Sequence, residues 1–156
     1  MNLSIAMKSK LIPYLATFLL TAFFLTIYAT PYMAVATLAY GAIICGFVAR
    51  KDRITHIRLM STGILIDLSL VLTLEFQRDA IGKAIGGTLN TWQLSHIVAS
   101  TFAVLCYLPA GYLGWKMASG RKTAAIQKSH KICGFSALIF RTIGFILMFS
   151  FLHASK

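Results

Sequence analysis

The chain has 156 residues, of which 58% are hydrophobic and only 12% are charged. Soluble domains normally carry about a quarter charged residues, so this composition excludes an ordinary water-soluble fold. The net charge of +11 would suit nucleic-acid binding, but the basic residues lie in short segments between apolar blocks. We therefore interpret them as membrane-topology signals. The three cysteines form no CxxC pair, which excludes a disulfide framework and covalent haem attachment.

The apolar residues fall into five blocks of about 18 to 26 residues, the length at which a helix crosses a hydrocarbon layer of ~30 Å. This pattern predicts an all-α, polytopic membrane protein, with one bundle of about five transmembrane helices in a single domain over residues 1–156. The first two blocks are joined by Thr30-Pro31, which predicts a tight turn and an antiparallel hairpin. The predicted spans are residues 11–28, 32–49, 56–76, 92–117 and 131–153.

The distribution of lysine and arginine predicts how the helices are oriented. If the N-terminus lies in the cytoplasm, eleven basic residues in the loops or at the ends of the spans share the cytoplasmic side, and three lie on the outer side: Arg78, Lys83 and Lys156. Short loops rich in lysine and arginine stay in the cytoplasm. We therefore predict an N-in, C-out topology.

The four histidines all lie near the ends of the last three predicted spans. In this topology His56 and His130 lie at the inner boundary, and His96 and His153 lie at the outer boundary. Two histidines at each boundary are what two bis-histidine haem sites need. Histidines also favour the membrane interface as amphipathic residues, so an interfacial role without a cofactor stays open.

Two charged residues, Asp67 and Arg141, lie deep in their predicted spans, where a charge is costly unless it is paired. They follow His56 and His130 by eleven residues, about three helical turns, so each shares a helix face with its histidine. Both spans run in the same direction, so we predict that the two charges meet as a buried ion pair. A purely structural pair, and one in which Arg141 also neutralises a haem propionate or quinone oxygen, both stay open.

Further candidate ligands lie close to the two inner histidines. Met60 is one turn beyond the first of them and Cys133 is three residues beyond the second, so the inner site would also suit Cu(I). Ordinary helix packing is the alternative for both residues. If the ligand is haem, Arg53, Arg58 and Lys131 would provide cations for its propionates.

The stretches His56-Ile-Arg-Leu-Met60, Leu94-Ser-His-Ile97 and Ser129-His-Lys-Ile132 resemble the histidine motifs of the YozB-like (CtaM-like) family of small bacterial membrane proteins. The resemblance covers about residues 50–151 and carries over to the three histidines in these stretches. It implies a place in the bacterial cytoplasmic membrane and, as for some members, a link to cytochrome oxidase assembly. The paired-histidine bundle is also similar in plan to transmembrane dihaem b-type cytochromes.

We therefore expect a b-type-cytochrome-like protein that binds one or two b haems through paired histidines and transfers electrons. The alternatives are a haem-copper oxidase assembly factor that handles copper or haem, and an accessory membrane subunit without a cofactor. The expected partners are the lipid bilayer, respiratory-chain subunits or a c-type cytochrome, and a quinone, but no nucleic acid. A stand-alone hydrolytic enzyme is not expected, because the sequence contains no HExxH motif and no nucleophile with an adjacent base.

Overall fold

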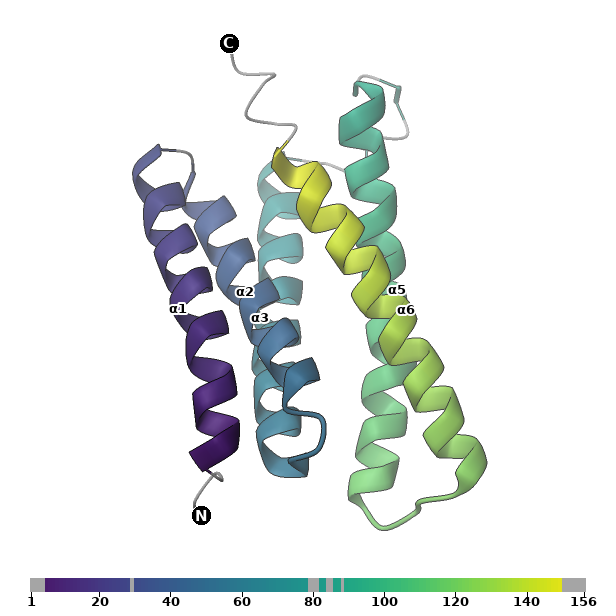
Figure 1. Ribbon diagram of the computed structural model, residues 1–156. Coiled ribbons are helices and arrows are strands. Elements are labelled where there is room, and N and C mark those ends of the chain that lie inside the picture. The colour runs from purple at the N-terminus through teal and green to yellow at the C-terminus, as the bar shows by residue number, and fades with distance from the viewer. Residues whose placement is uncertain (1–4, 29, 79–81, 84–85, 88, 150–156) are drawn as a thin grey trace. The chain divides into compact units, whose positions relative to one another are not determined.

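The computed structural model describes residues 5–28, 30–78, 82–83, 86–87 and 89–149, and its long elements are all helices (Figure 1). They are α1 (Ile5–Tyr28), α2 (Pro31–Val48), α3 (Arg53–Arg78), α5 (Thr91–Ala118) and α6 (Ala124–Met148). This confirms the predicted all-α architecture. The chain divides into two compact units, residues 1–77 and 78–156, and each is described by itself.

The helices are built to face lipid. Helices α2, α3, α5 and α6 are long and apolar enough to cross a membrane, and α1 contains a shorter apolar stretch, Leu11–Ile27. Small and polar residues are buried while many large apolar ones are exposed, which is the reverse of a soluble core and suits a hydrocarbon solvent. The chain is therefore a multi-pass membrane protein. Among the most exposed apolar residues are Phe76, Leu65, Leu108 and Ile146.

In the first unit, α1 and α2 form the predicted antiparallel hairpin. Thr30 caps α2, since its hydroxyl oxygen accepts a hydrogen bond from the backbone N–H of Met33 at 3.3 Å, and Pro31 follows as the first helical residue. The rings of Phe18 and Tyr40 pack edge to face with centroids 5.8 Å apart. The hairpin thus has an apolar contact between its helices and a capped turn at its end.

Helix α2 also packs closely against α3, and glycine makes this approach possible. A Cβ added to Gly63 would lie 2.8 Å from Cγ1 of Ile43 and 2.9 Å from the backbone oxygen of Ala39. Neither distance leaves room for a methyl group. Helix α2 therefore contacts α1 on one side and α3 on the other, which explains why so many of its residues are buried.

The turn between α2 and α3 is ordered by Asp52. Its carboxylate accepts hydrogen bonds from the hydroxyl of Thr55 at 2.8 Å and from the backbone N–H groups of Ile54 and Thr55 at 3.2 and 3.4 Å. The hydroxyl bond from Thr55, helped by the backbone bonds, lowers the pKa of the Asp52 carboxyl below its usual value. This cap starts α3 at Arg53, three residues before the predicted span.

In the second unit, α5 and α6 pack along two stripes of buried residues, most of them small, that are spaced three or four positions apart. Such a stripe lies along one face of a helix, and small side chains let two helices approach closely in a membrane. The stripes contain Ala99, Ala103, Tyr107 and Ala110 on α5 and Ala137, Arg141, Gly144 and Met148 on α6.

The turn between α5 and α6 is short, and backbone hydrogen bonds order it. Gly120 adopts a positive φ of 87°, and the N–H of Arg121 donates to the carbonyl of Lys116 at 3.1 Å, as in a Schellman helix end. Thr123 then caps α6 by accepting from the N–H of Ile126 at 3.3 Å. Helix α6 therefore begins at Ala124, and His130 lies inside the helix and not at its start.

Loss of the Asp52 cap should lower stability in a pH-dependent way. The folded-state pKa of Asp52 is lowered, so its contribution is complete above the unfolded value of ~3.9 and disappears as the pH falls through the folded value. Asp52→Ala should therefore lower the melting temperature in detergent at neutral pH, with a difference that shrinks in acid. A difference that does not change with pH would contradict this role.

Filling the closest contact between α2 and α3 should destabilise the first unit. Gly63→Ala should cost about 1–3 kcal/mol of unfolding free energy, the usual range for overpacking, because its methyl group meets backbone atoms. Gly134→Ala on α6 is the matched control, because a Cβ there meets nothing within 4 Å. Unfolding in mixed micelles would compare the two, and equal effects would show that Gly63 is not a tight contact.

Candidate functional site

The three histidines that the structure describes all make the same interaction. Nδ1 of His56, on α3, lies 2.8 Å from the backbone oxygen of Gly46 on α2. A carbonyl oxygen can only accept, so Nδ1 carries the proton and donates it. In the neutral form of such a ring the lone pair lies on Nε2, which is the nitrogen that can bind a metal or a haem iron.

The hairpin in the second unit repeats this interaction at both of its ends. Nδ1 of His96 on α5 donates to the carbonyl of Gly144 on α6 at 2.7 Å. Nδ1 of His130 on α6 donates to the carbonyl of Ala110 on α5 at 3.0 Å. Each helix therefore provides one histidine donor and one carbonyl acceptor, and both rings donate from Nδ1.

A spacing of fourteen residues accounts for this reciprocal arrangement. His96 precedes Ala110 by fourteen residues, and His130 precedes Gly144 by the same number. Fourteen residues are two repeats of the seven-residue packing pattern, so a histidine and an acceptor at this spacing occupy the same stripe about 21 Å apart. The α5–α6 hairpin is thus bonded at two levels along a single contact face.

The α2–α3 hairpin has a related layout. Tyr32 precedes Gly46 on α2 by the same fourteen residues. The hydroxyl of Tyr32 donates to the side-chain oxygen of Gln77 at 2.6 Å at one end, and the bond from His56 to Gly46 closes the other end. A tyrosine here takes the place that a histidine takes in the second unit.

Small residues surround the histidines and their acceptors. A Cβ at Gly114 would lie 3.3 Å from Cε1 of His130, and one at Gly46 would lie 2.9 Å from the Sδ atom of Met60. The Met60 thioether, a predicted copper ligand, therefore packs against the α2 backbone beside His56. Cys133, the other predicted copper ligand, is a half-buried free thiol on α6.

The structure places the other predicted site residues as follows. Asp67 and Arg141 are 1% and 4% exposed, as expected for charges deep in apolar helices. The predicted propionate partners Arg53, Arg58 and Lys131 are exposed. His153 lies outside the described residues. The ion pair between Asp67 and Arg141 and the sharing of one ligand by His56 and His130 stay predictions.

Within the described part of either unit, no three His, Cys, Asp or Glu side chains are grouped as a metal site would need. Bis-histidine ligation of haem uses only two protein ligands, so it does not depend on such a group. The residues fit haem in a different respect. Every described histidine has the Nδ1–H bond to a backbone carbonyl that commonly orients a ligating imidazole and raises its basicity.

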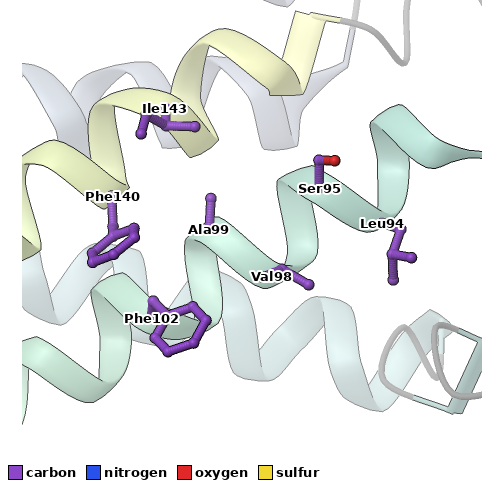
Figure 2. Close-up of a pocket in the computed structure, with 7 residues that line it drawn as sticks. All are labelled: Leu94, Ser95, Val98, Ala99, Phe102, Phe140 and Ile143. Atoms are coloured by element: carbon purple, nitrogen blue, oxygen red, sulfur yellow. The ribbon is translucent and has the colours of Figure 1, made fainter.

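The surface of the α5–α6 hairpin contains an open groove of about 350 Å³ next to His96 in the sequence (Figure 2). Its lining is apolar apart from the hydroxyl of Ser95, and the rings of Phe102 and Phe140 stack across it with centroids 5.4 Å apart. A lining of this kind offers no ligand to a metal and suits hydrocarbon. None of the described histidines lines the groove.

Removing the proton donor of His130 should loosen the α5–α6 hairpin. His130→Ala should lower the unfolding free energy by about 0.6 kcal/mol, and at most ~2, the range for hydrogen bonds between membrane helices. His130→Asn should restore most of it, because the asparagine NH₂ group lies close to the position of Nδ1 and can donate to the Ala110 carbonyl. If the two variants of the cofactor-free protein unfold alike in a denaturing-detergent titration, the bond is not stabilising.

Comparisons with known proteins do not identify this chain: no family model, curated protein or solved structure matches it. The resemblance to the YozB-like family therefore stays an expectation from the histidine stretches. What characterises the site is its geometry. Three imidazoles in two hairpins each donate from Nδ1 to a backbone carbonyl of the neighbouring helix.

Proposed function

We propose that this protein is a haem-binding membrane protein of the b-type cytochrome plan, which transfers electrons in the bacterial cytoplasmic membrane. The observation that carries the proposal is the hydrogen bond from Nδ1 to a backbone carbonyl at His56, His96 and His130. A bound haem would supply the one-electron chemistry. The protein contributes ligation, orientation and charge.

The orientation of each histidine follows from its helix contact. A backbone carbonyl inside a membrane helix cannot move without breaking the helix, so it fixes the ring more firmly than a flexible side chain would. It also strengthens the imidazole as a donor to iron, because the Nδ1–H bond increases electron density on the ring. Both effects favour tight axial ligation by Nε2.

Charge around the haem would come from exposed and buried residues. Arg58 and Lys131 lie within one helical turn of His56 and His130 along the chain and are exposed, so they are the cations proposed for the propionates. Arg141 is buried and is suited to balance an anionic group inside the membrane. As predicted from the sequence, His56 and His130 would share one haem, and His96 and His153 another.

The alternative of a copper-handling assembly factor has less support. Met60 packs against the Gly46 backbone, which is ordinary helix contact. Respiratory-chain subunits, a c-type cytochrome or a quinone would be partners of a carrier and of an assembly factor alike. Metal analysis of the purified protein separates the two, since copper without haem would select the assembly factor.

The test uses substitutions that separate ligation from helix contact. The purified protein should show a Soret band that sharpens on reduction. His56→Asn and His130→Asn keep a donor for the carbonyl but remove Nε2, so each should lower haem affinity by more than ~100-fold, beyond the typical loss for an outer-shell change. If the two histidines share a haem, each substitution should remove the same spectral signal.

The matched control is Tyr32→Phe, which breaks the bond to Gln77 in the α2–α3 hairpin and leaves every histidine in place. It should keep the haem spectrum. Haem loss in this variant too would mean that the Asn variants act through stability. A purified protein that neither contains haem nor takes it up, or Asn variants with unchanged spectra, would refute the proposal and leave the histidines as helix contacts.

A further inference from the structure

The turn between α5 and α6 carries a cluster of basic side chains that the histidine site does not use. We call it the basic turn, and its members are Lys116, Arg121, Lys122 and Lys128. Residues 80–156 contain no Asp or Glu, so this stretch of the chain has no acidic side chain near the basic turn. The positive charge at this end of the hairpin is therefore not neutralised by its own sequence.

The backbone of the basic turn is ordered by hydrogen bonds at both helix ends. The hydrogen bond from the N–H of Arg121 to the carbonyl of Lys116, together with the positive φ of Gly120, closes α5. Thr123 caps α6 only two residues later. Arg121 and Lys122 thus stand, exposed, between two helix ends.

The start of α6 adds to the positive potential. The first turn of the helix contains no acidic residue, although a negative charge there would be stabilising. Lys128 lies in the second turn and is exposed. An external anion would therefore be attracted by the side chains and by the helix terminus together.

Two aromatic side chains indicate what kind of anion fits. Tyr112 and Trp115, at the same end of α5, are 57% and 62% exposed, with ring centroids 6.2 Å apart. Exposed Tyr and Trp rings at a helix end are typical of the headgroup level of a bilayer. Lys116 lies one turn from Tyr112, so the apolar rings and a cation share one side of the helix.

The α2–α3 turn makes an instructive contrast. It is also basic, but the carboxylate of Asp52 lies within it, and the guanidinium of Arg50 stacks on the ring of Phe47 at 4.8 Å. Part of its charge is thus balanced internally. The two turns offer a similar number of cations in different settings, and this makes one a control for the other.

We propose that the basic turn binds the headgroup of an anionic phospholipid, with Arg121, Lys122 and Lys128 around the phosphate and Tyr112 and Trp115 against the upper acyl region. Clusters of Lys and Arg directly beside a membrane helix bind anionic lipids in this way. The inference is independent of the proposed haem function. It also holds whichever side of the membrane the turn faces.

Trp115 is a natural reporter of lipid at this site. The chain has two tryptophans, so Trp92→Phe leaves Trp115 as the single indole. In the full-length protein in phosphatidylcholine bilayers, brominated phosphatidylglycerol should quench Trp115 more strongly than brominated phosphatidylcholine. The preference in binding constant should be at least about fivefold, the contribution of a single cation near an anionic surface.

Arg121→Gln, Lys122→Gln and Lys128→Gln, combined in this background, should bring the preference close to one. All three side chains are exposed, and Lys122→Glu alone tests the same point with a smaller change. The matched control combines Arg50→Gln, Lys51→Gln and Arg53→Gln, which lie at the α2–α3 turn and are exposed. It removes the same charge and should keep the preference at Trp115.

Three results would overturn the proposal. One is equal quenching by the two brominated lipids in the unaltered turn. The second is an equal loss of preference in the control, which would indicate general attraction by net charge. The third is complete displacement by inorganic phosphate at matched ionic strength, which would assign the turn to free phosphate and not to a lipid.

Discussion

The fold depends on close contact between helix backbones inside a medium that offers no hydrogen bonds of its own. A histidine or tyrosine side chain reaches a neighbouring helix only where small residues let the two axes approach. Gly63 permits this in the first unit, and the alanines and Gly144 permit it in the second. The same contacts that pack the helices therefore also orient the imidazoles, so stability and the candidate chemistry rest on one set of residues.

The sequence was sufficient to predict most of the helical architecture. Apolar blocks of membrane-spanning length located the helices, and Thr30-Pro31 predicted the first hairpin correctly because a cap and an N1 proline have a direct physical meaning. The start of α6 was placed late, at Lys131. Hydropathy marks the part of a helix that lies in hydrocarbon, whereas residues 124–130 are helical but mixed in polarity. Thr123 was the signal for the true start.

The sequence could identify the candidate histidines but not how they are held. His56, His96 and His130 stand out because polar residues are scarce in apolar helices. Their acceptors are the backbone carbonyls of Gly46, Gly144 and Ala110. Every residue has a backbone carbonyl, so the residue type does not identify these acceptors. Only the packing stripe selects one carbonyl from the rest. The repeated spacing of fourteen residues could have indicated it.

That spacing makes the α5–α6 hairpin intolerant of a change in length. Adding or deleting one residue between His96 and Ala110 would rotate everything beyond it by about 100° around the helix axis. One end of the hairpin would then lose its bond whichever way the helix turned, and the alanine stripe would be split across two faces. Substitutions at exposed positions of these helices do not change this spacing. The hairpin should therefore accept many substitutions in its lipid-facing surface but hardly any insertion or deletion within α5.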